Sequence, residues 1–197
     1  MLYLIVKRAI DLLVSFILIL ILFPVLLIIG IAIYISNPGS VIYKQIRMGK
    51  GRKVFKLLKF RSMIVNAPDI RNEDGSTFNS ENDPRVTKIG RFIRKTSLDE
   101  LPQLFNVFLG DMSLVGPRPD PIDAVNFYRE KDFMRLTVPQ GITGWAQVNG
   151  RNSISWERRR DYDLEYLQIK SILADIKILI MTFIQVLGRA GINTHDT

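Results

Sequence analysis

The chain has 197 residues, enough for one compact domain with an anchor and too few for two sizeable soluble domains with separate cores. It contains no cysteine and one histidine, His195, which excludes disulfides, thiolate catalysis and cysteine-based zinc sites. Catalysis is therefore left to carboxylates, hydroxyls, Lys, Arg or a hard metal, and the formal net charge of +8 indicates anionic partners: phosphate-bearing substrates, an anionic bilayer or nucleic acid.

An apolar run from Leu12 to Ile35 dominates the N-terminal part of the sequence. It reaches the roughly 20 residues that let a helix cross a bilayer core, and it exceeds the apolar core of a cleavable signal peptide, about 7–15 residues. The mean hydropathy of +0.13 fits one such segment joined to a soluble domain. We therefore expect a membrane anchor over residues 1–36 and a membrane-associated domain over residues 37–197.

The middle of this run contains Pro24, which removes a backbone donor and clashes with the preceding turn, so we expect a kink or break there. Lys and Arg residues flank the run on both sides, and the positive-inside tendency draws both ends to the cytoplasmic face. A re-entrant helix that enters the bilayer and returns satisfies both features, whereas a Pro-kinked spanning helix satisfies only the first. The residues alone leave the two geometries open.

Short elements follow the run. Two extended pieces, at 41–43 and 54–58, surround a turn at Gly49 and Gly51, and a polar stretch over 66–84 predicts a loop.

Apolar residues recur at helical spacing in three later segments, which predicts helices over 85–95, 101–109 and 172–187. Three prolines between 117 and 121 exclude regular structure in the stretch that follows the predicted helix at 101–109. The apolar stripe of the last helix either faces the core or lies in the membrane interface, and the residues leave both interpretations open.

The most informative segment for chemistry lies at 94–102. Ser97 and Glu100 match a helix capping box, in which both would serve only to begin a helix. Pro102 fits that interpretation poorly, because it would then lie past the first turn and remove a helical hydrogen bond. A later cap leaves Asp99 and Glu100 at the mouth of a helix instead.

A carboxylate pair at a positive helix end, beside Arg94 and Lys95, is an environment that keeps Asp ionised and attracts phosphate. Asp99 then suits a nucleophile that attacks phosphorus and forms a covalent intermediate. Glu100 suits a ligand of Mg²⁺, which usually binds one or two carboxylates together with substrate phosphates.

Five basic residues are candidates for binding substrate phosphate: Lys59, Arg61, Arg94, Arg118 and Arg151. Any one of them taken alone is more commonly a surface charge. The prolines on either side of Arg118 favour a functional loop, because a rigid chain positions a side chain at low entropic cost. The segment 141–151 mixes glycine, amide and aromatic residues, which suits a nucleotide pocket or equally a loop and strand.

Taken together, six segments resemble the small monotopic phosphoglycosyl transferases of the bacterial sugar transferase family, in this order over nearly the whole chain. They are KRAID at 7–11, YKQIRMG at 43–49, KFRSM at 59–63, TSLDELPQL at 96–104, GDMSLVGPRP at 110–119 and GITGWAQVNGR at 141–151. The resemblance implies an α/β fold of mostly short helices with few strands, a re-entrant membrane helix that breaks at Pro24, and interfacial amphipathic helices.

The resemblance also implies the reaction. In that family the position of Asp99 is the nucleophile and that of Glu100 is associated with Mg²⁺. A sugar-1-phosphate passes from a UDP-sugar to Asp99 with release of UMP, and then to undecaprenyl phosphate. This is the first membrane step of exopolysaccharide, capsule or glycoprotein glycan synthesis, and residues 37–197 would be the catalytic domain on the cytoplasmic face of the inner membrane.

The chain departs from the family pattern in places. Many relatives carry Arg-Pro-Gly where this chain has Pro139, Gln140 and Gly141, and a Ser where it has Phe23. Larger members carry further membrane helices before this unit, so we expect the minimal catalytic form. The transferred sugar, the pathway and whether two copies form a homodimer stay open.

Three other functions compete with the transferase. A membrane-tethered partner protein without enzymatic activity would use Asp99 and Glu100 only as a helix cap. A glycosidase is disfavoured because neighbouring cations oppose a general acid of raised pKa. Nucleic acid is disfavoured because the basic residues are spread along the chain beside the anchor and form no single aromatic-laced stripe.

Overall fold

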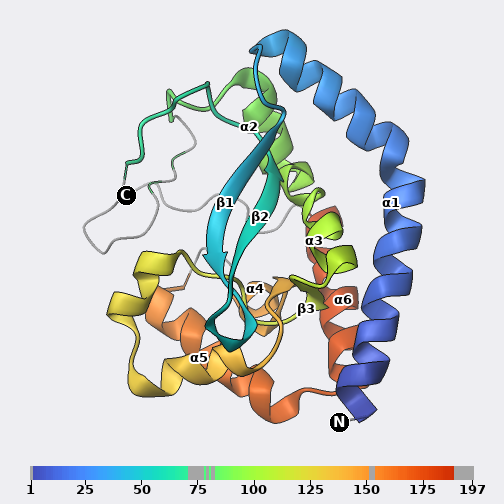
Figure 1. Cartoon of the computed structure of the whole chain (residues 1–197), viewed down its shortest axis with the longest axis vertical. Coiled ribbons are helices and arrows are strands. Elements are labelled where there is room, and N and C mark those ends of the chain that lie inside the picture. Colours follow the sequence, from blue (N-terminus) through green and yellow to red (C-terminus); the bar gives the residue numbers. More distant parts are fainter. Residues whose placement is uncertain (1, 71–77, 79, 81–82, 151–153, 189–197) are drawn as a thin grey trace.

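The computed structural model describes residues 2–70, 78, 80, 83–150 and 154–188. Its longest element is α1 (Leu2–Ser36), which contains Pro24. Of the expected kink or break, the structure shows a bend without a break: α1 stays helical throughout and changes direction near its middle (Figure 1). A single proline removes one helical hydrogen bond, and packing on both sides of it keeps the helix continuous.

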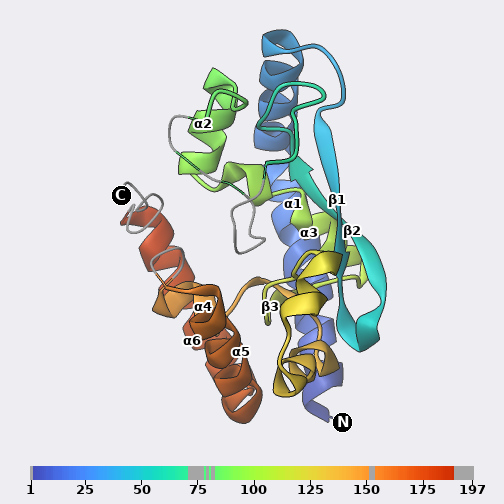
Figure 2. The ribbon, with the colours of Figure 1, turned by 90° about the vertical axis from the view of Figure 1, so that its left-hand side faces the viewer.

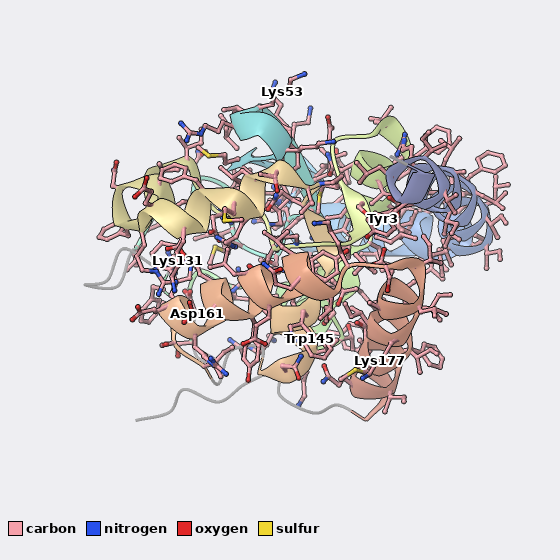
Figure 3. The ribbon with its side chains drawn as sticks, turned by 90° about the horizontal axis from the view of Figure 1, so that it is seen from below. Tyr3, Lys53, Lys131, Trp145, Asp161 and Lys177 are labelled. Atoms are coloured by element: carbon pink, nitrogen blue, oxygen red, sulfur yellow. The ribbon has the colours of Figure 1, made fainter. Side chains whose placement is uncertain are left out.

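One face of α1 belongs to the core of the protein. Leu26, Ile29 and Ile33 recur at helical spacing and form a buried cluster with Phe60 and Ile93. Only 17% of the most apolar 18-residue stretch of α1 is buried, whereas the core helix of a soluble protein is mostly buried. The side chains that α1 directs away from the rest of the protein, here called the body (residues 37–188 as described), are apolar (Figure 3).

The N-terminal part of α1 is tied to the same body by polar contacts. Lys7 Nζ lies 2.7 Å from Asp175 Oδ2, and both side chains are buried. Arg8 donates a 2.6 Å hydrogen bond to the carbonyl of Val107, near the C-terminal end of a later helix, where partial negative charge gathers. The body therefore contacts α1 near both of its ends, and α1 runs along one whole side of the molecule (Figure 1).

The two predicted extended pieces are confirmed as strands that are longer than expected, and they form a hairpin. Strands β1 (Ile42–Met48) and β2 (Val54–Phe60) pair antiparallel, with Ile42 opposite Phe60 and Met48 opposite Val54. The connecting turn has left-handed backbone at Gly51, with a φ of 66°.

Two predicted helices are also confirmed, and both begin slightly later than expected. Helix α2 (Lys88–Lys95) begins after Thr87, whose side chain accepts a hydrogen bond from the amide of Gly90. Helix α3 (Gln103–Leu109) begins after Pro102 and ends at Gly110, whose φ of 96° is the left-handed conformation common at helix ends. The short 3₁₀ turn η2 (Leu98–Glu100) lies between them.

A small parallel sheet of two strands connects the later part of the chain to α1, the hairpin, α2 and α3. Strands β3 (Ser113–Val115) and β4 (Gly141–Thr143) are joined by the 3₁₀ segments η3 (Ile122–Phe127) and η4 (Glu130–Thr137). A Cβ on Gly141 would lie 2.1 Å from the backbone nitrogen of Gly116, so glycine is required for this close approach.

Three helices complete the fold: α4 (Trp145–Asn149), α5 (Trp156–Ile169) and α6 (Ile172–Leu187). Helix α6 buries Ile178 completely but leaves Leu173 and Phe183 exposed, so it packs by one face and presents apolar side chains on another. Helices α5 and α6 lie on the side of the molecule away from the hairpin (Figure 2). The protein is thus a mixed α/β chain that is mostly helical with few strands, as predicted.

Candidate active site

The two predicted catalytic carboxylates lie in η2, between α2 and α3. Ser97 precedes them with a φ of 57°, a left-handed conformation that is uncommon for a residue other than glycine and is found at strained functional sites. The Ser97 side chain makes no capping hydrogen bond, so the capping-box interpretation is wrong. Pro102 instead stands immediately before α3, where its missing amide proton costs nothing.

Two leucines determine which way the carboxylates face. Leu98 and Leu101 pack against the buried cluster that α1 shares with the hairpin. Residues three apart lie on one side of a 3₁₀ turn, so both leucines point toward α1 and leave Asp99 and Glu100 on the remaining sides. The same short turn therefore packs on α1 through its leucines and presents the acidic pair on its other sides.

Glu100 is held by two cations from different elements. Lys59 Nζ, from β2, lies 2.9 Å from Glu100 Oε1. Arg118, from the loop after β3, donates through Nη2 to the same oxygen and through Nη1 to Oε2 at 3.4 Å. Burial favours the neutral acid, but the charges of Arg118 and Lys59 outweigh it and hold the pKa of Glu100 well below its usual range.

Asp99 stands beside these groups and forms no hydrogen bond or ion pair with any residue that the structure describes. Burial raises the pKa of Asp99 to about 6, against the opposing charge of Lys59, while the charge of Glu100 adds to the rise. The sequence suggested that cations would control this carboxyl, but the structure shows burial outweighing them. Asp99 is still mostly ionised at neutral pH, and it is poorly solvated.

Arg94 brings a third cation to the pair. Its Nε donates a 2.8 Å hydrogen bond to Ser62 Oγ, and its charge lowers the pKa of Asp99. The fold thus gathers Lys59, Arg94 and Arg118 around Asp99 and Glu100, as expected for a site that binds phosphate.

The other predicted residues lie elsewhere. Arg61 is buried and donates to the carbonyl of Asn37, directly after α1, where it stabilises the end of that helix. Pro24 is exposed on α1. Arg151 lies outside the described residues, so its predicted contact with phosphate stays a prediction.

Comparison with known proteins identifies the group to which this arrangement belongs. The family model described as bacterial sugar transferase matches residues 2–189, which is nearly the whole chain. The chain belongs to the bacterial sugar transferase family. This confirms the resemblance drawn from the six sequence segments.

Individual members of the bacterial sugar transferase family are similar over most of the chain. A UDP-glucose:undecaprenyl-phosphate glucose-1-phosphate transferase of Escherichia coli is 45% identical over 184 residues, covering 89% of this chain and 39% of that protein. A UDP-galactose-lipid carrier transferase of Erwinia amylovora is 43% identical over 197 residues, covering 94% of this chain and 41% of that protein. The uncharacterized sugar transferase EpsL of Bacillus subtilis is 47% identical over 169 residues, covering 85% of this chain and 81% of that protein. This chain therefore spans about two fifths of the first two relatives and most of the third.

In this family member, sequence reasoning missed one residue that builds the site. Asn106, in the middle of α3, is buried; its Oδ1 accepts from the amide of Leu58 at 2.9 Å and its Nδ2 donates to the carbonyl of Lys56 at 2.8 Å. The side chain thus completes the edge of β2 and fixes Lys59 relative to the start of α3. The only signal was an asparagine inside a predicted helix, where that residue is disfavoured.

The acidic pair could hold a Mg²⁺ ion. Glu100 Oε1 is shared by Lys59 and Arg118, whereas among the described residues its Oε2 receives only the 3.4 Å contact from Arg118. No three His, Cys, Asp or Glu side chains gather as a metal cage in the part of the chain that the structure describes. Glu100, with Asp99 beside it, therefore suits a Mg²⁺ ion whose shell is completed by substrate phosphates and water.

Proposed function

We propose that this protein transfers a sugar-1-phosphate from a UDP-sugar to undecaprenyl phosphate through a covalent phosphosugar–Asp99 intermediate, with release of UMP. The observation that carries the proposal is Asp99 itself: a half-buried carboxylate without a partner among the described residues, surrounded by Lys59, Arg94 and Arg118. Ion-paired acids stabilise a fold, whereas an unpaired, poorly solvated carboxylate among cations is arranged to react with an anionic substrate.

In the first step, a carboxylate oxygen of Asp99 attacks the phosphorus that carries the sugar. The bond between this phosphorus and the oxygen bridging to UMP breaks, and UMP leaves with that oxygen. Arg118 and Lys59 lie where they can bind the oxygens that gain charge during this displacement. Mg²⁺, when bound at Glu100, would neutralise charge on the diphosphate.

In the second step, a phosphate oxygen of the polyprenyl phosphate attacks the same phosphorus. The acyl-phosphate bond breaks, Asp99 regains its carboxylate, and the sugar is left on a polyprenyl diphosphate. Two bulky substrates can thus use one site in turn, because the covalent intermediate separates their visits.

The membrane part of the proposal rests on α1 and α6. We place α1 as a re-entrant helix in the inner membrane, with the body on the cytoplasmic face. A spanning helix would carry its two ends to opposite faces, but the body contacts α1 near both of its ends. The exposed apolar side chains of α6, including Leu173 and Phe183, suit an interfacial helix beside it.

The proposal is tested by measuring UMP release from a panel of UDP-sugars, with Mg²⁺ and undecaprenyl phosphate. UDP-glucose and UDP-galactose come first, because relatives are named for them. Asp99→Asn should lower transfer by a factor of about 10⁴ or more, since removal of a nucleophile costs at least this much in other covalent enzymes. Glu130→Gln, which changes an exposed carboxylate of η4, is the matched control and should leave transfer unchanged.

Intact-protein mass spectrometry then distinguishes the proposed enzyme from the alternative, a membrane-tethered partner protein without enzymatic activity. Without acceptor, the wild-type protein should gain the mass of one sugar phosphate, and Asp99→Asn should gain none. Full transfer by the Asn variant, or silence of the wild type across the panel, would contradict the proposal.

A further inference from the structure

A large apolar groove lies between the second half of α1, the hairpin and the start of α3. Its volume is about 470 Å³, within the range of about 300–1,000 Å³ that is typical of ligand pockets. Almost all of its lining is apolar, with Phe23, Leu27, Gly30 and Tyr34 on the α1 side and Phe60 and Phe105 on the other. A groove of this composition can hold a hydrocarbon chain but not a sugar or a nucleotide.

The groove lies close to the cation cluster, which is formed by Lys59, Arg94 and Arg118. Phe60 is the residue after Lys59 in β2, and Pro102, which also lines the groove, lies three residues after Asp99. Three residues span at most about 11 Å, so the apolar wall begins within this distance of the Asp99 backbone. A ligand that occupied both places would have an anionic head attached directly to an apolar chain.

We infer that this groove binds the isoprene units nearest the phosphate of the polyprenyl phosphate acceptor and so guides that phosphate toward Asp99. The inference rests on the proposed function and adds a location for the acceptor. The rest of the polyprenyl chain, which is far longer than the groove, lies in the bilayer.

The chemistry of the site favours this acceptor over an ordinary phospholipid. In a polyprenyl phosphate the single chain carries its phosphate directly, so head and chain can fill the cation cluster and the groove together. In a phospholipid, glycerol and a second chain separate the phosphate from the hydrocarbon. Lipid tails are as apolar as the groove, so the chain gains little from leaving the bilayer, and selectivity comes from the phosphate and from close packing.

Gly30 provides the means to test this inference. Gly30 has no side chain where α1 lines the groove, and it occurs there although glycine is disfavoured inside a helix. A Cβ at this position would meet only Val41 Cγ1, at 3.4 Å, which is an ordinary contact. Gly30→Ala is therefore tolerated, whereas Gly30→Phe fills the groove with its ring.

The test compares two half-reactions in detergent micelles with the active UDP-sugar. Gly30→Phe should raise the KM for undecaprenyl phosphate about tenfold or more, because filling a binding space with a side chain is strongly unfavourable. Leu27→Trp, which narrows the groove from an exposed position, should act in the same direction. Both variants should keep the wild-type burst of UMP in the absence of acceptor, because that step does not use the groove.

The matched controls are Gly30→Ala and Ile28→Phe. Ile28 is 66% exposed on the same helix and does not line the groove, so Ile28→Phe adds a ring outside it. Both controls should keep the acceptor KM within about twofold of the wild type. A phosphate that carries only two isoprene units should be a poorer acceptor than undecaprenyl phosphate for the wild type, and this preference should shrink in Gly30→Phe.

Three results would overturn the inference: an unchanged acceptor KM in both groove variants, an equal rise in Ile28→Phe, which would indicate bulk lipid, or loss of the UMP burst in both groove variants. Absence of the burst in the wild type would instead contradict the proposed function, so the two failures are distinguishable.

Discussion

Asp99 and Asp163 are two carboxylates, the first half-buried and the second fully buried, with similar pKa values and different surroundings. Burial raises the pKa of each to about 6, against the opposing charges of Lys59 and Arg135 respectively. Asp163 nevertheless has a partner, because Arg135 Nη2 lies 2.6 Å from its Oδ2, and the same Arg135 pairs with Asp120 at 2.6 Å. Asp99 has no such partner among the described residues.

The comparison shows that a raised pKa alone does not identify a reactive acid. In the cluster of Arg135, Asp120 and Asp163, charges are buried together and hold η4, α5 and the loop after β3 in place. At Asp99 the cations are directed instead at the neighbouring Glu100, which leaves one carboxylate accessible for chemistry. Substitutions in the first cluster should therefore affect stability, and substitutions in the second should affect transfer.

The largest effect on stability is expected from Arg135→Met. This change leaves two buried carboxylates, Asp120 and Asp163, without their cation, and breaking a buried ion pair costs about 3–5 kcal/mol. Chemical denaturation in micelles measures the loss. Adding Asp120→Asn and Asp163→Asn should restore part of the stability, because no charge then remains unpaired; a triple variant less stable than the single one would contradict the electrostatic explanation.

A smaller effect, on rate, is expected from Arg118→Met. Loss of one charged donor near the reacting phosphorus should lower the rate of UMP release about 10²-fold or more, as for other groups that stabilise transition-state charge. Arg61→Met is the comparison, because Arg61 binds the Asn37 carbonyl and not the acidic pair. It should leave the rate per folded molecule close to that of the wild type and lower stability by about 1.5–3 kcal/mol. Equal losses of rate in the two variants would show that Arg61 contributes to phosphate binding, as the sequence predicted.

The smallest effect is a shift in the titration of Asp99. In the metal-free protein, the carboxyl ¹³C NMR signal of Asp99 should titrate with a midpoint near pH 6. The Glu100 carboxylate should stay ionised to a much lower pH, so its signal should not change in this range. Lys59→Met removes the largest charge that opposes burial, so the Asp99 midpoint should move to higher pH. Lys56→Met, on the opposite face of β2, should leave it unchanged. A midpoint near pH 4 in the wild type would show that burial does not dominate.

Much of the fold could be predicted because its signals are local. The two extended pieces, α2, α3 and α6 follow from short apolar runs, helical spacing and glycine or proline beside them. Helix α5 was missed because its buried positions include Arg160 and Asp163, so no apolar stripe marks it. The β3–β4 pair was missed because each strand has three residues and their pairing depends on the distant Gly116 and Gly141.

The composition of the site was easier to predict than its electrostatics. The segments at 59–63, 94–102 and 116–119 pointed to Lys59, Arg118 and the acidic pair, which the fold brings together. Burial of Asp99 depends on tertiary packing, and so does the positive φ of Ser97, which lies between α2 and the acidic pair. No local pattern in the sequence encodes either feature.

The packing of α1 has a consequence for how the protein can be handled. Because Leu26, Ile29 and Ile33 complete the same cluster as Leu98 and Leu101, removal of α1 would strip the turn that carries Asp99 of its support. Any medium that stabilises α1, whether bilayer or micelle, therefore acts as a ligand for the folded state and raises its stability by mass action. A truncation that lacks α1 is thus expected to lose the fold of the turn that carries Asp99, and the composition of the surrounding lipid or detergent becomes a variable of the protein's stability.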